Sequence, residues 1–293
     1  MSEAETIQWF PGHMTRTKRK IEQSLKLVDV VAEIVDARLP LSSQNPDLDK
    51  IILNKPRIII LNKCDMADKK ATNMWLEYYK SIGKLAIAVD CKSGRGLEKF
   101  IPCVKSLLKE KIESAKKKGI INKNIKVMVV GIPNVGKSSF INKMAKGARA
   151  KTEDRPGVTR GNQWFTIGQN FDLLDTPGVL WPKFEDKLVG EKLAFCGSVK
   201  DEILDTEHLA IRLLDFLKKD FGGNINIRYK LEKVKDELAD LSGLDLLKLI
   251  GKKRGMLISG GEIDTERAAI MVLDEFRSAK LGSITLENPP KSK

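Results

Sequence analysis

The residues best suited to chemistry lie at positions 127–139, in the sequence VMVVGIPNVGKSS. Four apolar residues lead into Gly131, and Gly136, Lys137 and Ser138 follow at the spacing G-x-x-x-x-G-K-[ST]. In such a loop, backbone N–H groups at a helix N-terminus bind phosphate oxygens, the lysine reaches the β- and γ-phosphates, and the serine hydroxyl binds Mg²⁺. The sequence therefore predicts a phosphate-binding loop between a strand and a helix that begins at Lys137.

A second set of polar residues, N-K-x-D, follows another apolar run and comprises Asn62, Lys63 and Asp65. A carboxylate at the mouth of a sheet can accept both the N1–H and the 2-amino hydrogens of guanine, and adenine offers neither, so Asp65 predicts guanine selection. We expect Asn62 to reach the ring edge and tie loops together, and the stem of Lys63 to lie over the base. In the later segment DCKS, we expect backbone N–H groups around Cys91 to meet the guanine carbonyl.

A third set, Asp175-Thr176-Pro177-Gly178, also follows a predicted strand. Asp175 is expected to hold Mg²⁺ through water, and the N–H of Gly178 to bind the γ-phosphate. In the polar loop between this set and the phosphate loop, Thr159 is the residue expected to close over Mg²⁺ and the γ-phosphate in the triphosphate state. GTP and GDP are the ligands that these sets predict together.

The elements that must position these residues are alternating strands and helices. Apolar runs predict strands and helical periodicity predicts helices between them, which indicates an α/β fold: a mostly parallel six-stranded sheet with helices on both faces. The predicted strands are Val30–Val35, Arg57–Leu61, Leu85–Val89, 127–130, Gln163–Ile167 and Phe171–Leu174, and the predicted helices are Thr15–Val28, Pro46–Leu53, Lys69–Ser81 and Leu97–Lys118.

The order of the sets along the chain is unusual, because N-K-x-D precedes the phosphate loop, whereas in ordinary GTPases it follows. This order indicates a circularly permuted P-loop GTPase domain, in which the helix Leu97–Lys118 bridges the original termini. We expect this domain to span residues 1–182. An all-helical domain is expected over residues 183–293, directly connected in the chain to the D-T-P-G segment.

Charge and cysteine content bear on partners and compartment. The formal net charge of the 293 residues is +13, all of it in residues 1–182, because basic and acidic residues balance in residues 183–293. Such asymmetry favours a polyanionic partner for the first part. The four cysteines show no metal-binding spacing and are expected to be unpaired thiols in a reducing cytosol. No apolar run near 18 residues predicts a membrane span.

The segments WFPGHM, DARLP, NKCD, GIPNVGKSS, RPGVT, DTPGVLWPKFED and GKKRG resemble, almost end to end, the circularly permuted GTPases of the YlqF/RbgA type, the ribosome biogenesis GTPase A family. The resemblance implies a cytoplasmic factor in late assembly of the large ribosomal subunit, with a helical domain that contacts ribosomal RNA. Carried over by position, the nucleotide-binding residues also include Asn134, Val135 and Ser139, and Asn134 stands where related GTPases help to hold K⁺. Cys91 departs from the usual Ser-Ala pattern of the last guanine motif.

The position after D-T-P-G is Val179, where many GTPases have a glutamine that orients the attacking water. Valine cannot orient water, so we expect the isolated protein to hydrolyse GTP slowly. K⁺ held through Asn134, a group from the ribosome, or an imidazole of this chain could replace the glutamine. His13, in a Pro-Gly turn before a basic helix, is the catalytic candidate, beside the alternative that it is a surface residue.

The function predicted from these residues and the resemblance is a GTP-hydrolysing switch, with Mg²⁺ and K⁺ as cofactors, that docks on large-subunit RNA in the GTP state and leaves after hydrolysis. Stimulation by the large subunit, a monomeric state, and neither DNA nor membrane as a partner are expected. Two alternatives are a GTP-gated protein-interaction switch unrelated to ribosomes and a constitutive RNA-binding module with an incidental GTPase. Nucleotide-dependent and salt-dependent RNA binding would separate the first reading from both.

Overall fold

The computed structural model describes residues 19, 21–52, 55–120, 123–145, 163–176, 186–199, 205–232 and 235–290. The chain forms two compact units. Unit 1 comprises residues 1–184 together with 285–293, and unit 2 comprises residues 185–284. The boundary after residue 184 lies close to the expected one after residue 182. The C-terminal segment differs from expectation, because it belongs to unit 1 rather than to the helical domain.

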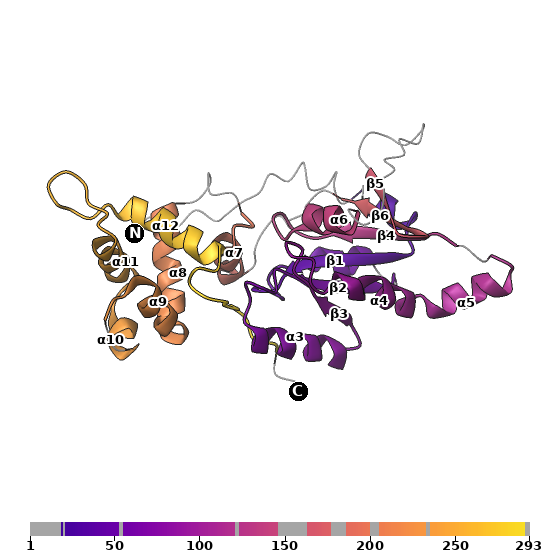
Figure 1. Ribbon diagram of the computed structural model, residues 1–293, viewed down its shortest axis with the longest axis horizontal. Helices are drawn as coiled ribbons and strands as arrows, with labels where there is room; N and C mark the ends of the chain where they lie inside the picture. Colours follow the sequence, from indigo (N-terminus) through magenta and orange to yellow (C-terminus); the bar gives the residue numbers. More distant parts are fainter. Residues whose placement is uncertain are drawn as a thin grey trace. The chain divides into compact units, whose positions relative to one another are not determined.

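Unit 1 contains a six-stranded sheet of order β3-β2-β1-β4-β6-β5 (Figure 1). The strands are β1 (Val30–Asp36), β2 (Arg57–Asn62), β3 (Leu85–Ala88), β4 (Ile125–Val130), β5 (Gln163–Ile167) and β6 (Phe171–Asp175). All neighbouring pairs are parallel except β5 with β6. The predicted mostly parallel six-stranded sheet is therefore confirmed.

The apolar runs form strands because helices cover both faces of the sheet. Every residue of β1 is buried. One face packs against helical residues 21–25, against α2 (Pro46–Ile52) and against α3 (Lys69–Ser81). On the other face, α4 (Phe100–Leu107) contacts β2 and α6 (Lys137–Ala145) contacts β6. The Phe100 and Phe140 rings of these two helices meet edge to face, with centroids 5.0 Å apart.

The single helix predicted over Leu97–Lys118 is wrong. The structure has a 3₁₀ turn, η1 (Leu97–Lys99), then α4, and after a break at Leu108 a separate helix, α5 (Lys109–Lys117). The break coincides with a change in burial: α4 buries two side chains of its apolar face, whereas Ala115 is the one residue of α5 that is buried. Packing on the sheet ends where the sequence becomes a run of charged residues.

Unit 2 contains the helices α7 (Lys187–Phe195), α8 (Thr206–Asp220), α9 (Gly222–Tyr229), α10 (Lys235–Asp240), α11 (Gly243–Lys253) and α12 (Thr265–Arg277). Helix α8 contacts α7, α11 and α12 and buries Leu213, Leu214 and Leu217 among them. The carboxylate of Asp205 accepts a hydrogen bond from the N–H of His208, an N-cap interaction of about 1 kcal/mol. No described helix of the chain is long and apolar enough to cross a membrane.

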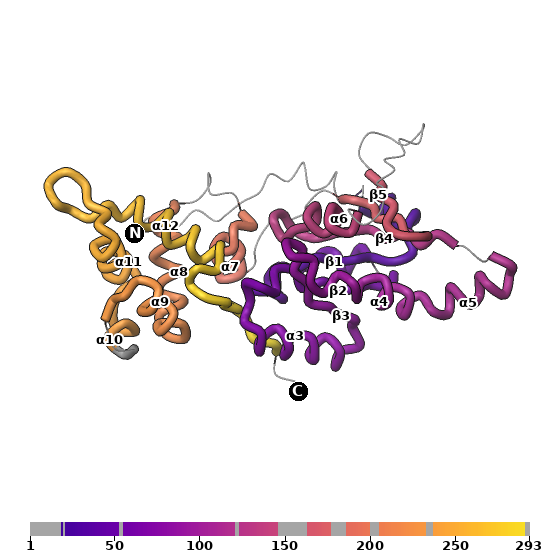
Figure 2. The backbone as a smooth tube through the Cα atoms, in the orientation of Figure 1, coloured from indigo at the N-terminus to yellow at the C-terminus, as the bar shows by residue number. Residues whose placement is uncertain are grey.

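After α12 the described chain forms no further helix, which corrects the expectation that residues 183–293 are helical throughout. The C-terminal segment, residues 285–287, instead lies beside α3 in unit 1 (Figure 2). The N–H of Leu286 donates to the carbonyl of Arg38 at 2.9 Å. The indole N–H of Trp75, which is fully buried, donates to the carbonyl of Glu287 at 3.0 Å. Two backbone groups of the segment thus take part in its attachment to unit 1.

The Glu287 side chain completes the attachment of the C-terminal segment. Its carboxylate accepts hydrogen bonds from the N–H of Leu41 at 2.8 Å and from both the N–H and the hydroxyl of Ser42. These bonds give both oxygens of the buried carboxylate hydrogen-bond partners. Residues 41–42, directly after the segment DARLP, thus contact Glu287, as Arg38 within that segment contacts Leu286.

Candidate nucleotide-binding site

A cavity of about 670 Å³ opens in unit 1 at the carboxyl ends of β2, β3 and β4. This edge of a parallel sheet is where ligands bind in α/β folds, and the volume falls within the roughly 300–1,000 Å³ of small-molecule sites. The predicted residues that line the cavity are Asn62, Lys63, Asp65, Cys91, Asn134, Gly136, Lys137, Ser138 and Ser139. The fold therefore brings the N-K-x-D and phosphate-loop sets together, although they are far apart in the sequence.

The phosphate loop leaves β4 through Gly131 and enters α6 at Lys137, as predicted. Gly131 has φ of 152°, and a Cβ atom there would lie 2.5 Å from the carbonyl oxygen of Ile34 in the neighbouring strand. Only glycine fits so close to a backbone oxygen. The first turn of α6 supplies N–H groups without partners inside the helix, which is the arrangement that binds phosphate oxygens.

The Lys137 side chain is buried, and its ammonium donates to the carbonyl of Ile132 at 2.8 Å. Burial lowers the pKa of Lys137 to about 8, although the nearby Asp175 carboxylate opposes the shift. A buried ammonium with a lowered pKa gains from a further negative group. The lysine is therefore suited to meeting phosphate oxygens.

The Asn62 side chain joins two loops of the cavity, as the sequence predicted. Its amide nitrogen donates to the carbonyl of Val135 at 2.8 Å, and its amide oxygen accepts from the N–H of Cys91 at 3.1 Å. Gly136 has φ of 100°, and a Cβ atom there would collide with the Asn62 amide. Val135 contributes through this carbonyl; it is not among the residues that line the cavity.

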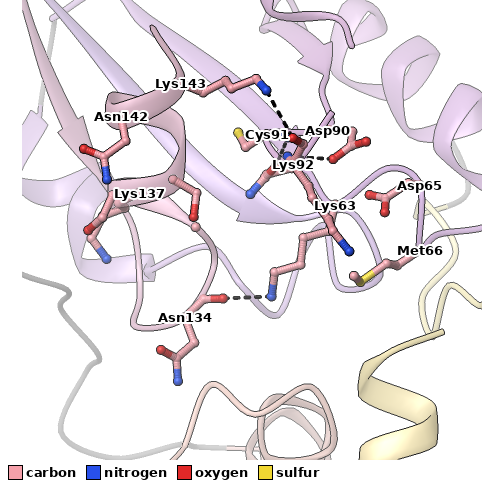
Figure 3. A pocket seen from close by; sticks show the side chains of 14 residues that line it. Lys63, Asp65, Met66, Asp90, Cys91, Lys92, Asn134, Lys137, Asn142 and Lys143 are labelled. Carbon is pink, nitrogen blue, oxygen red and sulfur yellow. Dashed lines mark hydrogen bonds between the residues drawn. The ribbon is translucent and has the colours of Figure 1, made fainter. Parts of the chain in front are cut away.

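Lys63 reaches across the cavity from the guanine motif to the phosphate loop. Its ammonium donates to the carbonyl of Asn134 at 2.8 Å (Figure 3). Asp65 is exposed and lies near Met66, at the end of the cavity opposite Lys137 (Figure 3). The arrangement leaves a carboxylate at one end, a phosphate loop at the other, and the aliphatic stem of Lys63 between them.

The backbone N–H groups of the loop after β3 make hydrogen bonds within the protein. The N–H groups of Lys92 and Ser93 donate to a carboxylate oxygen of Asp90 at 2.8 and 3.3 Å, and the N–H of Cys91 is used by Asn62. These three backbone N–H groups therefore have acceptors within the protein, and their contact with the guanine carbonyl stays a prediction. The short polar side chains hold the loop as an Asx turn.

The sequence reasoning missed Lys143, which also lines the cavity. Its ammonium donates to the carbonyl of Lys92 at 3.2 Å and so connects α6 with the loop after β3 (Figure 3). Helical spacing could have revealed it, because Ser139, Asn142 and Lys143 lie at positions i, i+3 and i+4 of α6 and all three line the cavity.

The residues expected to hold Mg²⁺ supply suitable oxygen atoms. Ser138 is exposed in the first turn of α6, and Asp175 is half-buried at the end of β6. Burial raises the pKa of the Asp175 carboxyl, while Lys137 and the N–H of Thr176 lower it. The Thr176 hydroxyl donates to the carbonyl of Val129 at 2.6 Å and holds Thr176 beside β4. A hydroxyl and a carboxylate are ligands that Mg²⁺ accepts.

Three predicted site residues, His13, Thr159 and Gly178, lie outside the described residues. The described residues nonetheless define a class of protein. The glycine loop lies between the central strand β4 and helix α6. Asn62 and Lys63 join it to the N-K-x-D motif at the end of β2, a parallel strand that β1 separates from β4. This arrangement is the site of a P-loop GTPase. Because the N-K-x-D strand precedes the loop in the chain, the domain is circularly permuted.

Comparison with known proteins agrees with this class. Residues 126–243 match the model of the 50S ribosome-binding GTPase family. The chain is 48% identical to the ribosome biogenesis GTPase A of Bacillus cereus, over 97% of this chain and 94% of the relative. Two Thermotoga maritima YlqF structures, bound to GDP and to GNP, share 31% and 29% identity, with TM-scores of 0.67 and 0.61. They match 92% and 94% of this chain, and 99% and 98% of their own lengths. The chain belongs to the ribosome biogenesis GTPase A family.

Proposed function

We propose that this protein is a GTP-hydrolysing switch that acts in late assembly of the large ribosomal subunit. It binds ribosomal RNA of that subunit in the GTP state and leaves after hydrolysis, as a cytoplasmic monomer. One observation supports GTP binding: Asp65, Lys63 and Lys137 line the same cavity, and Lys63 connects its two ends by a hydrogen bond to the phosphate loop. The family carries the ribosomal part.

In this proposal one end of the cavity binds the guanine base of GTP and the other end binds its phosphates. The Asp65 carboxylate accepts the N1–H and 2-amino hydrogens of guanine, and the stem of Lys63 covers the base. Lys137 and the N–H groups of residues 134–139 bind the phosphates. Because Asn62 and Lys143 each link the loop after β3 to the phosphate loop or to α6, the guanine end and the phosphate end move as one body.

Mg²⁺ would be held by the Ser138 hydroxyl and, through water, by the Asp175 carboxylate, with Thr159 joining in the GTP state. When bound it neutralises charge that develops on the β- and γ-phosphate oxygens. Gly178 would contribute its N–H to the γ-phosphate. Asn134 is the proposed K⁺ ligand, and its left-handed backbone, with φ of 61°, turns the loop at that point.

The test is GTP turnover by the purified protein in KCl and in NaCl, each with and without large ribosomal subunits. We expect slow turnover alone, because Val179 cannot orient water, and a large increase with subunits. Stimulation in KCl but not NaCl would support the K⁺ site. Turnover that subunits leave unchanged would contradict the ribosomal part and favour a protein-interaction switch instead.

The two histidines of the chain provide a matched pair for the catalytic proposal. We expect His13→Ala to keep GTP binding but lose subunit-stimulated turnover, because an imidazole beside the γ-phosphate would position the water. His208→Ala is the control, since His208 is exposed in the first turn of α8 in unit 2. If both variants hydrolyse GTP in the presence of large subunits as fast as the wild type does, His13 is not catalytic.

A further inference from the structure

The guanine motif is attached to a buried carboxylate that belongs to none of the nucleotide-binding sets. Asp36 ends β1, beside Asn62 in β2, and its side chain is completely buried. Its oxygens accept hydrogen bonds from the Arg38 side chain at 2.7 and 2.9 Å and from the Arg38 N–H at 3.0 Å. Arg38 is also buried, so Asp36 and Arg38 form a desolvated salt bridge inside unit 1.

A second cation shares the same carboxylate. The ammonium of Lys63 lies 2.9 Å from Asp36 Oδ2 and donates there, as well as to the Asn134 carbonyl. Lys63 has φ of 61°, an uncommon conformation for a residue with a side chain, which persists only where surrounding contacts stabilise it. The Lys63 ammonium is thus held between the Asp36 carboxylate and the phosphate loop.

We propose that Asp36 is a positioning residue for guanine nucleotides, which acts by holding Lys63 stretched across the cavity so that its stem is ready to cover the base. The inference rests on the proposed role of Lys63. Lys63 is partly exposed, and without an anchor its long side chain would sample many rotamers and lose that freedom on binding. The anchor removes this cost before the nucleotide arrives.

Charge supports the same arrangement. Burial alone would raise the pKa of the Asp36 carboxyl, but Arg38 and Lys63 outweigh burial and hold it well below its usual range. Asp36 therefore stays ionised across the physiological range. The ionised carboxylate can therefore pair with Arg38 and with Lys63 at the same time.

The test compares Asp36→Asn with Glu33→Gln as a matched control. Glu33 is a buried carboxylate on the same strand, paired with Arg57 at 3.1 Å, and it has no described bond to the guanine motif. The measurement is equilibrium binding of fluorescent GDP and of a non-hydrolysable GTP analogue to the full chain. We expect Asp36→Asn to weaken both about 10- to 100-fold, the effect of losing a charged hydrogen bond, and Glu33→Gln to bind as the wild type does.

A double-mutant cycle separates positioning from a general structural effect. Lys63→Met keeps the stem and removes the ammonium, so adding Asp36→Asn to Lys63→Met should cause no further loss of affinity. Should Asp36→Asn leave the buried Arg38 uncompensated and fail to fold, the double variant Asp36→Asn/Arg38→Met removes both charges and takes its place.

The outcomes distinguish the inference from the proposed function. Wild-type affinity in Asp36→Asn, or a loss of the same size with and without Lys63→Met, would overturn the role of Asp36 alone. Wild-type affinity in Lys63→Met itself would overturn the proposed guanine site. The proposed role of Asp36 is supported if Asp36→Asn lowers nucleotide affinity in the wild type but not in the Lys63→Met background, and Glu33→Gln leaves the affinity unchanged.

Discussion

Replacement of Asn62 by alanine should weaken both the fold of unit 1 and its hold on guanine nucleotides. The asparagine is 3% exposed and makes two hydrogen bonds, to the Val135 carbonyl and from the Cys91 N–H. Each lost bond costs about 1 kcal/mol, and each buried partner left unsatisfied adds a similar amount, so unfolding should become easier by about 2–4 kcal/mol. For a unit of this size the melting temperature should fall by roughly 5–15 °C.

The same substitution should reduce affinity for GDP by at least about tenfold, because the phosphate loop and the loop after β3 must then be ordered by the ligand. Thermal unfolding and titration with fluorescent GDP measure the two effects. Asn124→Ala is the control, since Asn124 is exposed and its amide donates to the Asp172 carboxylate, and neither residue lines the cavity. A variant Asn62→Ala that melts with the wild type and binds GDP within twofold of it would refute the reasoning.

Two further predictions concern buried groups away from the cavity. Burial raises the pKa of Glu33 from 4.5 to about 7. Between these pH values the folded state binds more protons than the unfolded state, so the free energy of unfolding should fall as pH rises from 4.5 to 7. Glu33→Gln should flatten that dependence in denaturant titrations, and an unchanged slope would contradict it. Truncation before residue 285 should destabilise unit 1 by about 2–4 kcal/mol and shift Trp75 fluorescence to the red, whereas truncation after Pro290 should do neither.

Much of unit 1 could be predicted because its signals are local. Continuous apolar runs such as 127–130 form buried parallel strands, and motifs that follow such runs must meet at the carboxyl edge of the sheet. The link through Asn62 could be predicted as well, since an amide both donates and accepts and so suits two backbone loops.

Contacts that depend on distant residues could not be predicted. Nothing near Asp36 in the sequence shows that Lys63 shares its carboxylate, although a charged residue at the end of a buried strand was a signal that it must have partners. Nothing near Glu287 shows that it returns to Ser42, because an extended segment has no periodicity to read. The break at Leu108 followed the end of packing on the sheet rather than any helix-breaking residue.

Because residues 285–287 belong to unit 1, both ends of unit 2 are connected to the GTPase unit. Unit 2 is an insertion between two segments of the GTPase unit, rather than an appendage at its end. An appendage held by one linker can explore a large volume, whereas an inserted unit has both ends confined like a closed loop, which restricts its motion and raises the effective concentration of each end near its anchor. A single backbone cut between the units would therefore leave unit 2 connected to the GTPase unit through its other end.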